Sequence, residues 1–93
     1  MTEYHFHWLP SQHKRSAIPS VSLEAESRLH GAALALRQFA ERGCDLTTPL
    51  AHLDLTEPDG VVHTLLVEEV IDWLNDPQQA DFIHRERLAD LLH

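Results

Sequence analysis

Cysteine is almost absent from this chain of 93 residues, since Cys44 is the only one. A single cysteine cannot form an internal disulfide or supply a cysteine-based zinc site. Long apolar runs are also missing, because none approaches the ~20 residues that a membrane-spanning helix requires. The first ten residues, MTEYHFHWLP, lack the basic-then-apolar order of a signal peptide. We therefore expect a cytoplasmic protein with no membrane contact.

Basic residues are scarce, with 7 Lys and Arg against 15 Asp and Glu and a formal net charge of −8. Residues 1–43 hold five basic and four acidic side chains, whereas residues 44–93 hold two basic and eleven acidic ones. Nucleic-acid affinity comes largely from Lys and Arg on phosphates, so direct nucleic-acid binding is disfavoured. The acidic second half is either a solvated surface or a face that docks a basic protein partner, including the basic first half of a second copy.

Two segments alternate apolar and polar residues and predict β-strands. In the first, Tyr4, Phe6 and Trp8 alternate with polar residues, and the second runs from Ala17 to Ala25. Apolar residues then recur at helical spacing from an N-cap at Ser27 to Gly43, which predicts the main amphipathic helix. Its apolar stripe is mostly alanine, so we expect it to lie close against one face of a sheet, with Gly31 at the closest approach.

A second hairpin is predicted around the turn Glu57-Pro58-Asp59-Gly60. Proline at the second turn position and glycine at the fourth are typical of a type I turn. The flanking strands are residues 52–56 and 61–67, and the second is apolar on both faces. We expect that strand at the centre of the sheet, or covered on its outer face by another chain.

The last third predicts short helices. One begins at Glu68 and Glu69, a second follows Asp76 as N-cap with Pro77 at its first position, and its apolar stripe breaks near His84. The expected fold is a single α+β domain over residues 1–93. It is a small antiparallel sheet of two hairpins in ββαββα order, packed with one main amphipathic helix and short C-terminal helices.

Histidines on the predicted strands suggest a metal site. His5 and His7 would share one strand face, and the second hairpin could complete a tetrahedron. Solvated or packed histidines explain the same pattern more simply, so we expect no cofactor. The candidate ligands are His5, His7, His52, Asp54 and His63.

Three of these residues also form a possible acid–base set, because Asp54 could orient His52 or His63. No serine or cysteine lies in a recognisable nucleophile turn, and Cys44 precedes Asp45, whose charge would raise the thiol pKa. The glycines are isolated, so the sequence offers no glycine-rich phosphate loop. We therefore expect a protein that is not an enzyme.

A homodimer is expected from the apolar content of the predicted sheet. One alanine-lined helix covers one sheet face, and the C-terminal helices could cover only part of the other, leaving the rest for a second copy. Trp73 lies beside its helix stripe and is either a ring at the edge of the core or part of an interface. The predicted interface residues are Trp73, Leu88, Leu91 and Leu92.

The ββαββα order with an acidic balance is similar, in topology alone, to small bacterial antitoxins of the HicB kind. Arginine outnumbers lysine six to one, which favours a GC-rich bacterial gene. Three functions remain open: an accessory module for protein–protein interaction, a metal or small-ligand binding protein, and an acidic antitoxin or inhibitor that docks a basic partner.

Overall fold

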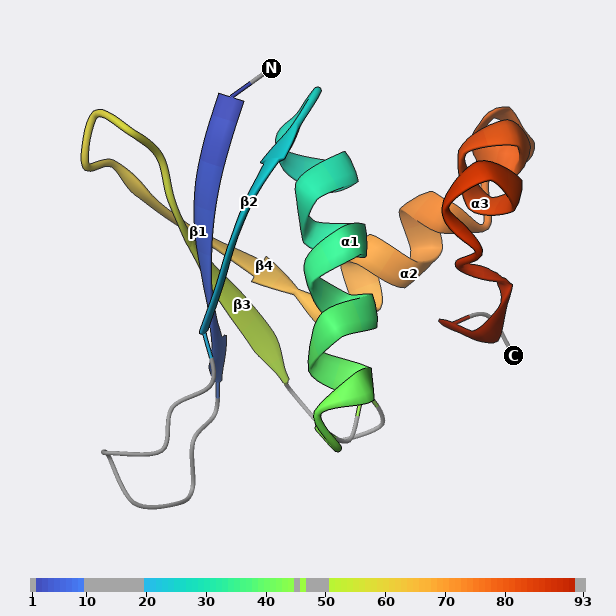
Figure 1. Ribbon diagram of the computed structural model, residues 1–93, viewed down its shortest axis with the longest axis horizontal. Helices are drawn as coiled ribbons and strands as arrows, with labels where there is room; N and C mark the ends of the chain where they lie inside the picture. The colour runs from blue at the N-terminus through green and yellow to red at the C-terminus, as the bar shows by residue number, and fades with distance from the viewer. Residues whose placement is uncertain (1, 10–19, 45, 47–50, 92–93) are drawn as a thin grey trace.

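The computed structural model describes residues 2–9, 20–44, 46 and 51–91 of the chain. The strands and helices follow one another in the order shown in Figure 1. The strands are β1 (Thr2–Leu9), β2 (Ser20–Ala25), β3 (His52–Thr56) and β4 (Val62–Leu66). The helices are α1 (Arg28–Glu41), α2 (Val67–Leu74), α3 (Ala80–Glu86) and the short 3-10 turns η2 (Pro77–Gln79) and η3 (Ala89–Leu91).

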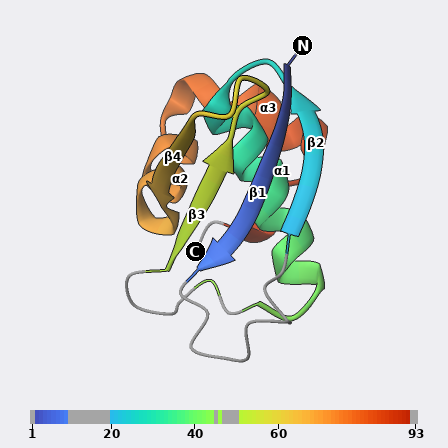
Figure 2. The same cartoon turned by 90° about the vertical axis from the view of Figure 1, so that its left-hand side faces the viewer.

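The four strands form one antiparallel sheet in the order β2-β1-β3-β4 (Figure 2). The α+β class and the ββαββα order predicted from the sequence are confirmed. The central pairing joins β1 to β3, with Phe6 opposite Leu55 and Trp8 opposite Leu53. The predicted strand that ends at Ala25 is confirmed from Ser20 onward, and its first residues lie outside the described part of the chain.

All the helices lie on one side of the sheet, so the other face carries no helix (Figures 1 and 2). The prediction that the C-terminal helices cover part of that other face is wrong. The reason is that α2 starts directly at the end of β4 and packs against α1, which already lies on the covered face. No helix among the described residues is long and apolar enough to cross a membrane.

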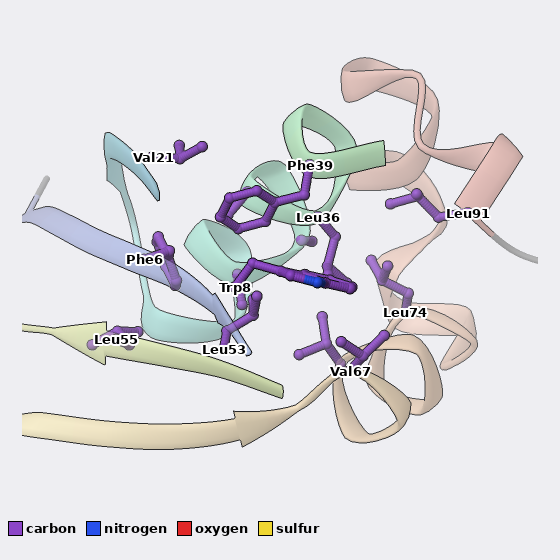
Figure 3. Close-up of a cluster of buried hydrophobic side chains, with 14 of the residues drawn as sticks. Phe6, Trp8, Val21, Leu36, Phe39, Leu53, Leu55, Val67, Leu74 and Leu91 are labelled. Atoms are coloured by element: carbon purple, nitrogen blue, oxygen red, sulfur yellow. The ribbon is translucent and has the colours of Figure 1, made fainter. Parts of the chain in front are cut away.

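The core lies between the covered sheet face and the helices, with α1 at its centre and residues of α2 and the C-terminal segment, such as Val67, Leu74 and Leu91, at one side (Figure 3). Phe6, Leu36 and Phe39 are fully buried there, and the alanines of α1 let the helix approach the strands closely. At Gly31 a side-chain methyl group would come within 3.1 Å of the Phe6 ring and 3.3 Å of the Ala25 Cβ atom. The expected close approach at this glycine is therefore confirmed.

Local sequence signals determine where α1 begins and where the chain turns between β3 and β4. Ser27 caps the helix, because its side chain accepts a hydrogen bond from the backbone N–H of His30. In the turn, the Gly60 N–H donates to the Glu57 carbonyl at 2.8 Å, and Gly60 has a φ of 92°. Glycine adopts that left-handed conformation without strain, so the hairpin predicted around this turn is confirmed.

Strand β4 is an edge strand, so its predicted place at the sheet centre is wrong. The apolar run that predicted a central strand spans two elements. The strand ends at Leu66, and Val67 is a buried residue of α2. The large hydrophobic residues left exposed in the described part of the chain are Val61 and Val62, at 46% and 56% exposure.

The C-terminal segment follows its predicted signals closely. Asp76 caps the turn η2 by accepting a hydrogen bond from the Gln78 N–H at 2.9 Å. The expected break near His84 occurs slightly later, at Arg87, which takes a left-handed conformation with a φ of 58°.

Candidate functional site

The sheet face without helices is lined by polar side chains. Strand register places Ser20, His7, Asp54 and Thr64 in one row across all four strands. The next row contains Ser22, His5, Thr56 and Val62. The expected surplus of apolar area on this face is therefore not found, and exposed apolar surface is concentrated at the β4 end.

Four of the five predicted metal ligands share this face. His7 lies opposite Asp54, and His5 and His52 lie two residues away on the same strands. His63 does not join them: it lies opposite Leu55 and faces the covered side, because neighbouring strand residues point to opposite faces. Within the part of the chain that the structure describes, no three His, Cys, Asp or Glu residues are arranged to hold a metal ion.

A serine–histidine–glutamate group also lies on the open face. Ser22 Oγ is 2.5 Å from His5 Nδ1, and His5 Nε2 is 3.8 Å from Glu3 Oε1. The second distance is too long for the hydrogen bond that orients a catalytic imidazole. The His5 and Glu3 side chains are 48% and 61% exposed, whereas triad chemistry depends on a carboxylate that is buried. The group therefore has the residue types of a catalytic triad, but it lacks the buried carboxylate and the short histidine–carboxylate hydrogen bond of one.

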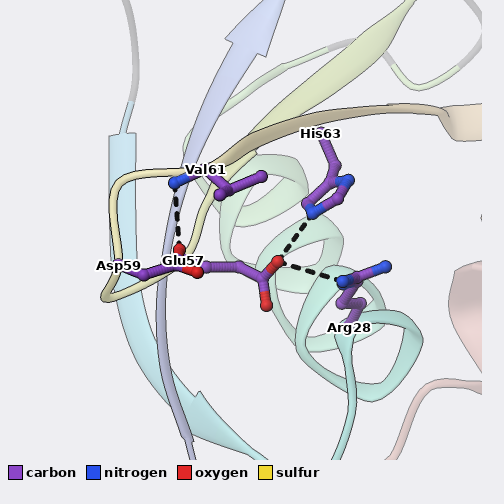
Figure 4. A network of polar contacts seen from close by, with 5 residues as sticks. All are labelled: Arg28, Glu57, Asp59, Val61 and His63. Carbon is purple, nitrogen blue, oxygen red and sulfur yellow. Dashed lines mark hydrogen bonds and ion pairs between the residues drawn. The ribbon is translucent and has the colours of Figure 1, made fainter.

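A polar cluster that the sequence did not predict lies on the other side (Figure 4). The Glu57 carboxylate lies 3.0 Å from an Arg28 nitrogen and 2.6 Å from His63 Nε2. These contacts join the first turn of α1 to the turn between β3 and β4. No local pattern indicates this cluster, because Arg28 and Glu57 are 29 residues apart in the chain.

An open groove lies beside this cluster. Its floor includes Tyr4, Leu29 and Leu65, and its rim includes Arg28 and three carboxylates. Those carboxylates belong to Glu26, Glu57 and Glu69, so the groove is acidic overall. A groove of this kind can accept a cationic side chain whose aliphatic part lies on the apolar floor.

The predicted interface residues occupy different environments. Leu88 and Leu91 are buried in the core of the chain itself, so they present no surface to a partner. Trp73 is partly buried against the core, with its ring 5.0 Å from His30 and 6.0 Å from Phe82 between ring centres. Leu92 lies outside the described residues.

Cys44 is partly buried against the core at the end of α1. Burial raises the pKa of its thiol, and the positive charge of Arg42 opposes this rise. The raised pKa has the direction predicted from the sequence, although the predicted cause, Asp45, lies outside the described residues. A raised pKa leaves little thiolate at neutral pH, which disfavours a nucleophilic role.

The outer margin of β4 offers backbone groups for pairing. The Glu57 N–H donates to the Val61 carbonyl and the Val67 N–H donates to the Ala51 carbonyl, both at 2.9 Å. Antiparallel strands alternate between residues that bond inward and residues that bond outward. The backbone groups of Val62, Thr64 and Leu66 therefore point away from β3, and no other described strand pairs with them.

Comparisons with protein-family models, curated proteins and solved structures find no match to this chain. These comparisons give no support to the resemblance in element order to HicB-type antitoxins. The surfaces that remain for a functional argument are the open sheet face with the β4 margin and the acidic groove.

Proposed function

We propose that the protein is a non-catalytic module for protein–protein interaction that binds an extended segment of another chain along β4. A bacterial, cytoplasmic setting, inferred from the sequence, is part of this proposal. The observation that carries it is the outer margin of β4, which combines outward backbone groups with the exposed side chains of Val61 and Val62. Main-chain hydrogen bonds supply affinity in strand addition, and side-chain contacts supply specificity.

The composition of β4 supports this role. Soluble proteins block exposed sheet edges with lysine, proline, bulges or inward-pointing charges. Strand β4 has the sequence VHTLL, which contains no lysine or proline, and its register with β3 is continuous from Val62 to Leu66, so the strand has no bulge. An edge of this kind favours pairing with another strand.

Site-specific photocrosslinking in the cells that produce the protein tests the proposal. A photoreactive phenylalanine at Val62 should give crosslinked products, because this side chain would lie against the partner strand. The same residue at Glu41, an exposed position at the end of α1, is the matched control and should give none. Absence of products at Val62, or equal products at both positions, would contradict the proposal.

A second candidate function is the docking of a basic partner, as an acidic inhibitor or antitoxin would do. The acidic groove favours it, because Glu26, Glu57 and Glu69 surround an apolar floor. Such binding should weaken as salt screens the charges. Replacing Glu26 and Glu69 by glutamine should weaken it too, whereas Val62→Lys should leave it unchanged.

A further inference from the structure

We infer that the strand bound by β4 is the β4 strand of a second copy, paired antiparallel about a two-fold axis at Thr64. The inference rests on the proposed function and names the partner. Joining the two four-stranded sheets in this way would give one continuous sheet of eight strands. Two-fold pairs are the commonest oligomers of soluble proteins.

The outward backbone groups of β4 are self-complementary. Centring the pair on Thr64 places Thr64 opposite the partner's Thr64 and Val62 opposite the partner's Leu66. Leu66 is the N-cap of α2, so its carbonyl accepts the first hydrogen bond of that helix. Four hydrogen bonds between strands remain: two between the threonines, and two from the Leu66 N–H groups to Val62 carbonyls.

Side chains of β4 match this register. Val62, Thr64 and Leu66 lie on the open sheet face. In an antiparallel pair, directly opposed side chains on one face contact each other. The partner's Leu66 would therefore cover Val62, which is 56% exposed in the single chain.

Charge within the strand itself favours this edge over the other one. Each copy carries a net charge of −8, so close approach is least opposed where carboxylates are absent. Strand β4 has no acidic residue, whereas β2 carries an exposed Glu24. The Arg42 side chain also donates a hydrogen bond at 2.7 Å to the Ser20 carbonyl of β2, which occupies part of that strand's backbone.

Charged residues at the ends of the paired strands predict how salt affects the stability of the dimer. The register brings the turn with Asp59 near the start of the partner's α2, where Glu68 and Glu69 lie. These like charges repel, so added salt should strengthen this dimer. Contact between the acidic and basic halves of two copies would instead weaken with salt. A five-residue strand pair is also smaller than a standard interface, so we expect a dissociation constant in the micromolar range.

Light scattering on the purified chain tests the inference from about 1 to about 200 micromolar, a range that spans micromolar dissociation. The mass should rise from 10.6 kDa toward twice that value, and further at higher salt. Val62→Lys should keep the protein monomeric. Ser22→Lys is the matched control, because Ser22 lies in the same cross-strand row on the opposite edge and the change in charge is equal.

Thr64→Pro provides an independent variant. It removes an outward N–H and no backbone hydrogen bond to β3, and it also removes the hydrogen bond from the exposed Thr64 hydroxyl to the Asp54 carboxylate at 3.1 Å. It should therefore abolish dimerisation while circular dichroism stays unchanged. Hydrogen exchange should show that the Thr64 and Leu66 amides of the wild type become protected as concentration rises.

Three outcomes would overturn the inference: a wild type that stays monomeric throughout, a dimer that withstands Val62→Lys, or a dimer lost in Ser22→Lys. A monomeric wild type that still gives photocrosslinks at Val62 to a different protein would overturn the inference alone and leave the proposed function standing. If Thr64→Pro does not fold, the two lysine variants decide the result.

Discussion

Gly31 is the residue at which helix α1 comes closest to the sheet, and its missing side chain makes that approach possible. Replacing glycine by alanine inside a helix normally stabilises it by about 1 kcal/mol. Here the new methyl group would meet the buried Phe6 ring at 3.1 Å and Ala25 at 3.3 Å, and overpacking costs about 1–3 kcal/mol. Gly31→Ala should thus lower the free energy of unfolding by about 1 kcal/mol in urea titrations.

A second substitution checks the cause of that loss. In a Phe6→Leu background the ring is absent, so Gly31→Ala should cost much less than in the wild type. An equal cost in both backgrounds would show that contact with Phe6 is not responsible.

Cys44 is the residue whose reactivity the fold changes most directly. Because burial raises the pKa of its thiol, iodoacetamide should label the native protein at pH 8 several-fold more slowly than the urea-unfolded protein. Arg42 lowers the same pKa, so Arg42→Gln should slow native labelling further. Mass spectrometry measures both rates, and faster labelling in Arg42→Gln would contradict the assigned role of the arginine.

At the scale of elements, Glu57 connects the β3–β4 turn to the first turn of α1. Glu57→Gln removes the ion pair with Arg28, whose side chain is 49% exposed, so the free energy of unfolding should fall by only about 0.5–1 kcal/mol at low salt. Urea titration should show a smaller difference at high salt, because salt screens the pair. Glu24→Gln on the exposed part of β2 is the control and should change stability little.

The boundaries of helices and turns were predictable from the sequence where neighbouring residues determine them. Ser27 and Gly60 define a helix start and a turn through backbone conformation, which neighbouring residues determine. The boundary between β4 and α2 was not predictable, since an apolar residue such as Val67 fits the pattern of the strand and of the helix equally well. His63 was grouped with the candidate metal ligands for a related reason: the position of a strand residue relative to the helices depends on packing.

For the whole molecule, charge predicts solubility. Protonation of all eight histidines would bring the net charge from −8 to zero, so the repulsion between molecules weakens as the pH falls. Solubility should therefore fall from pH 8 toward the isoelectric point of 5.3. Measuring the saturating concentration at intervals of pH checks this expectation, and a flat profile would contradict it.

The sequence by itself determined the element order, the strand and helix periodicities, the cap at Ser27, the turn at Gly60 and the acidic balance. Each of these depends on residues close together in the chain or on simple counts. Only the tertiary structure decided that β4 is an edge strand, that all the helices share one sheet face, and that Arg28 meets Glu57. These features depend on which strands pair and on which side the connections cross, and short-range periodicity carries no information about either.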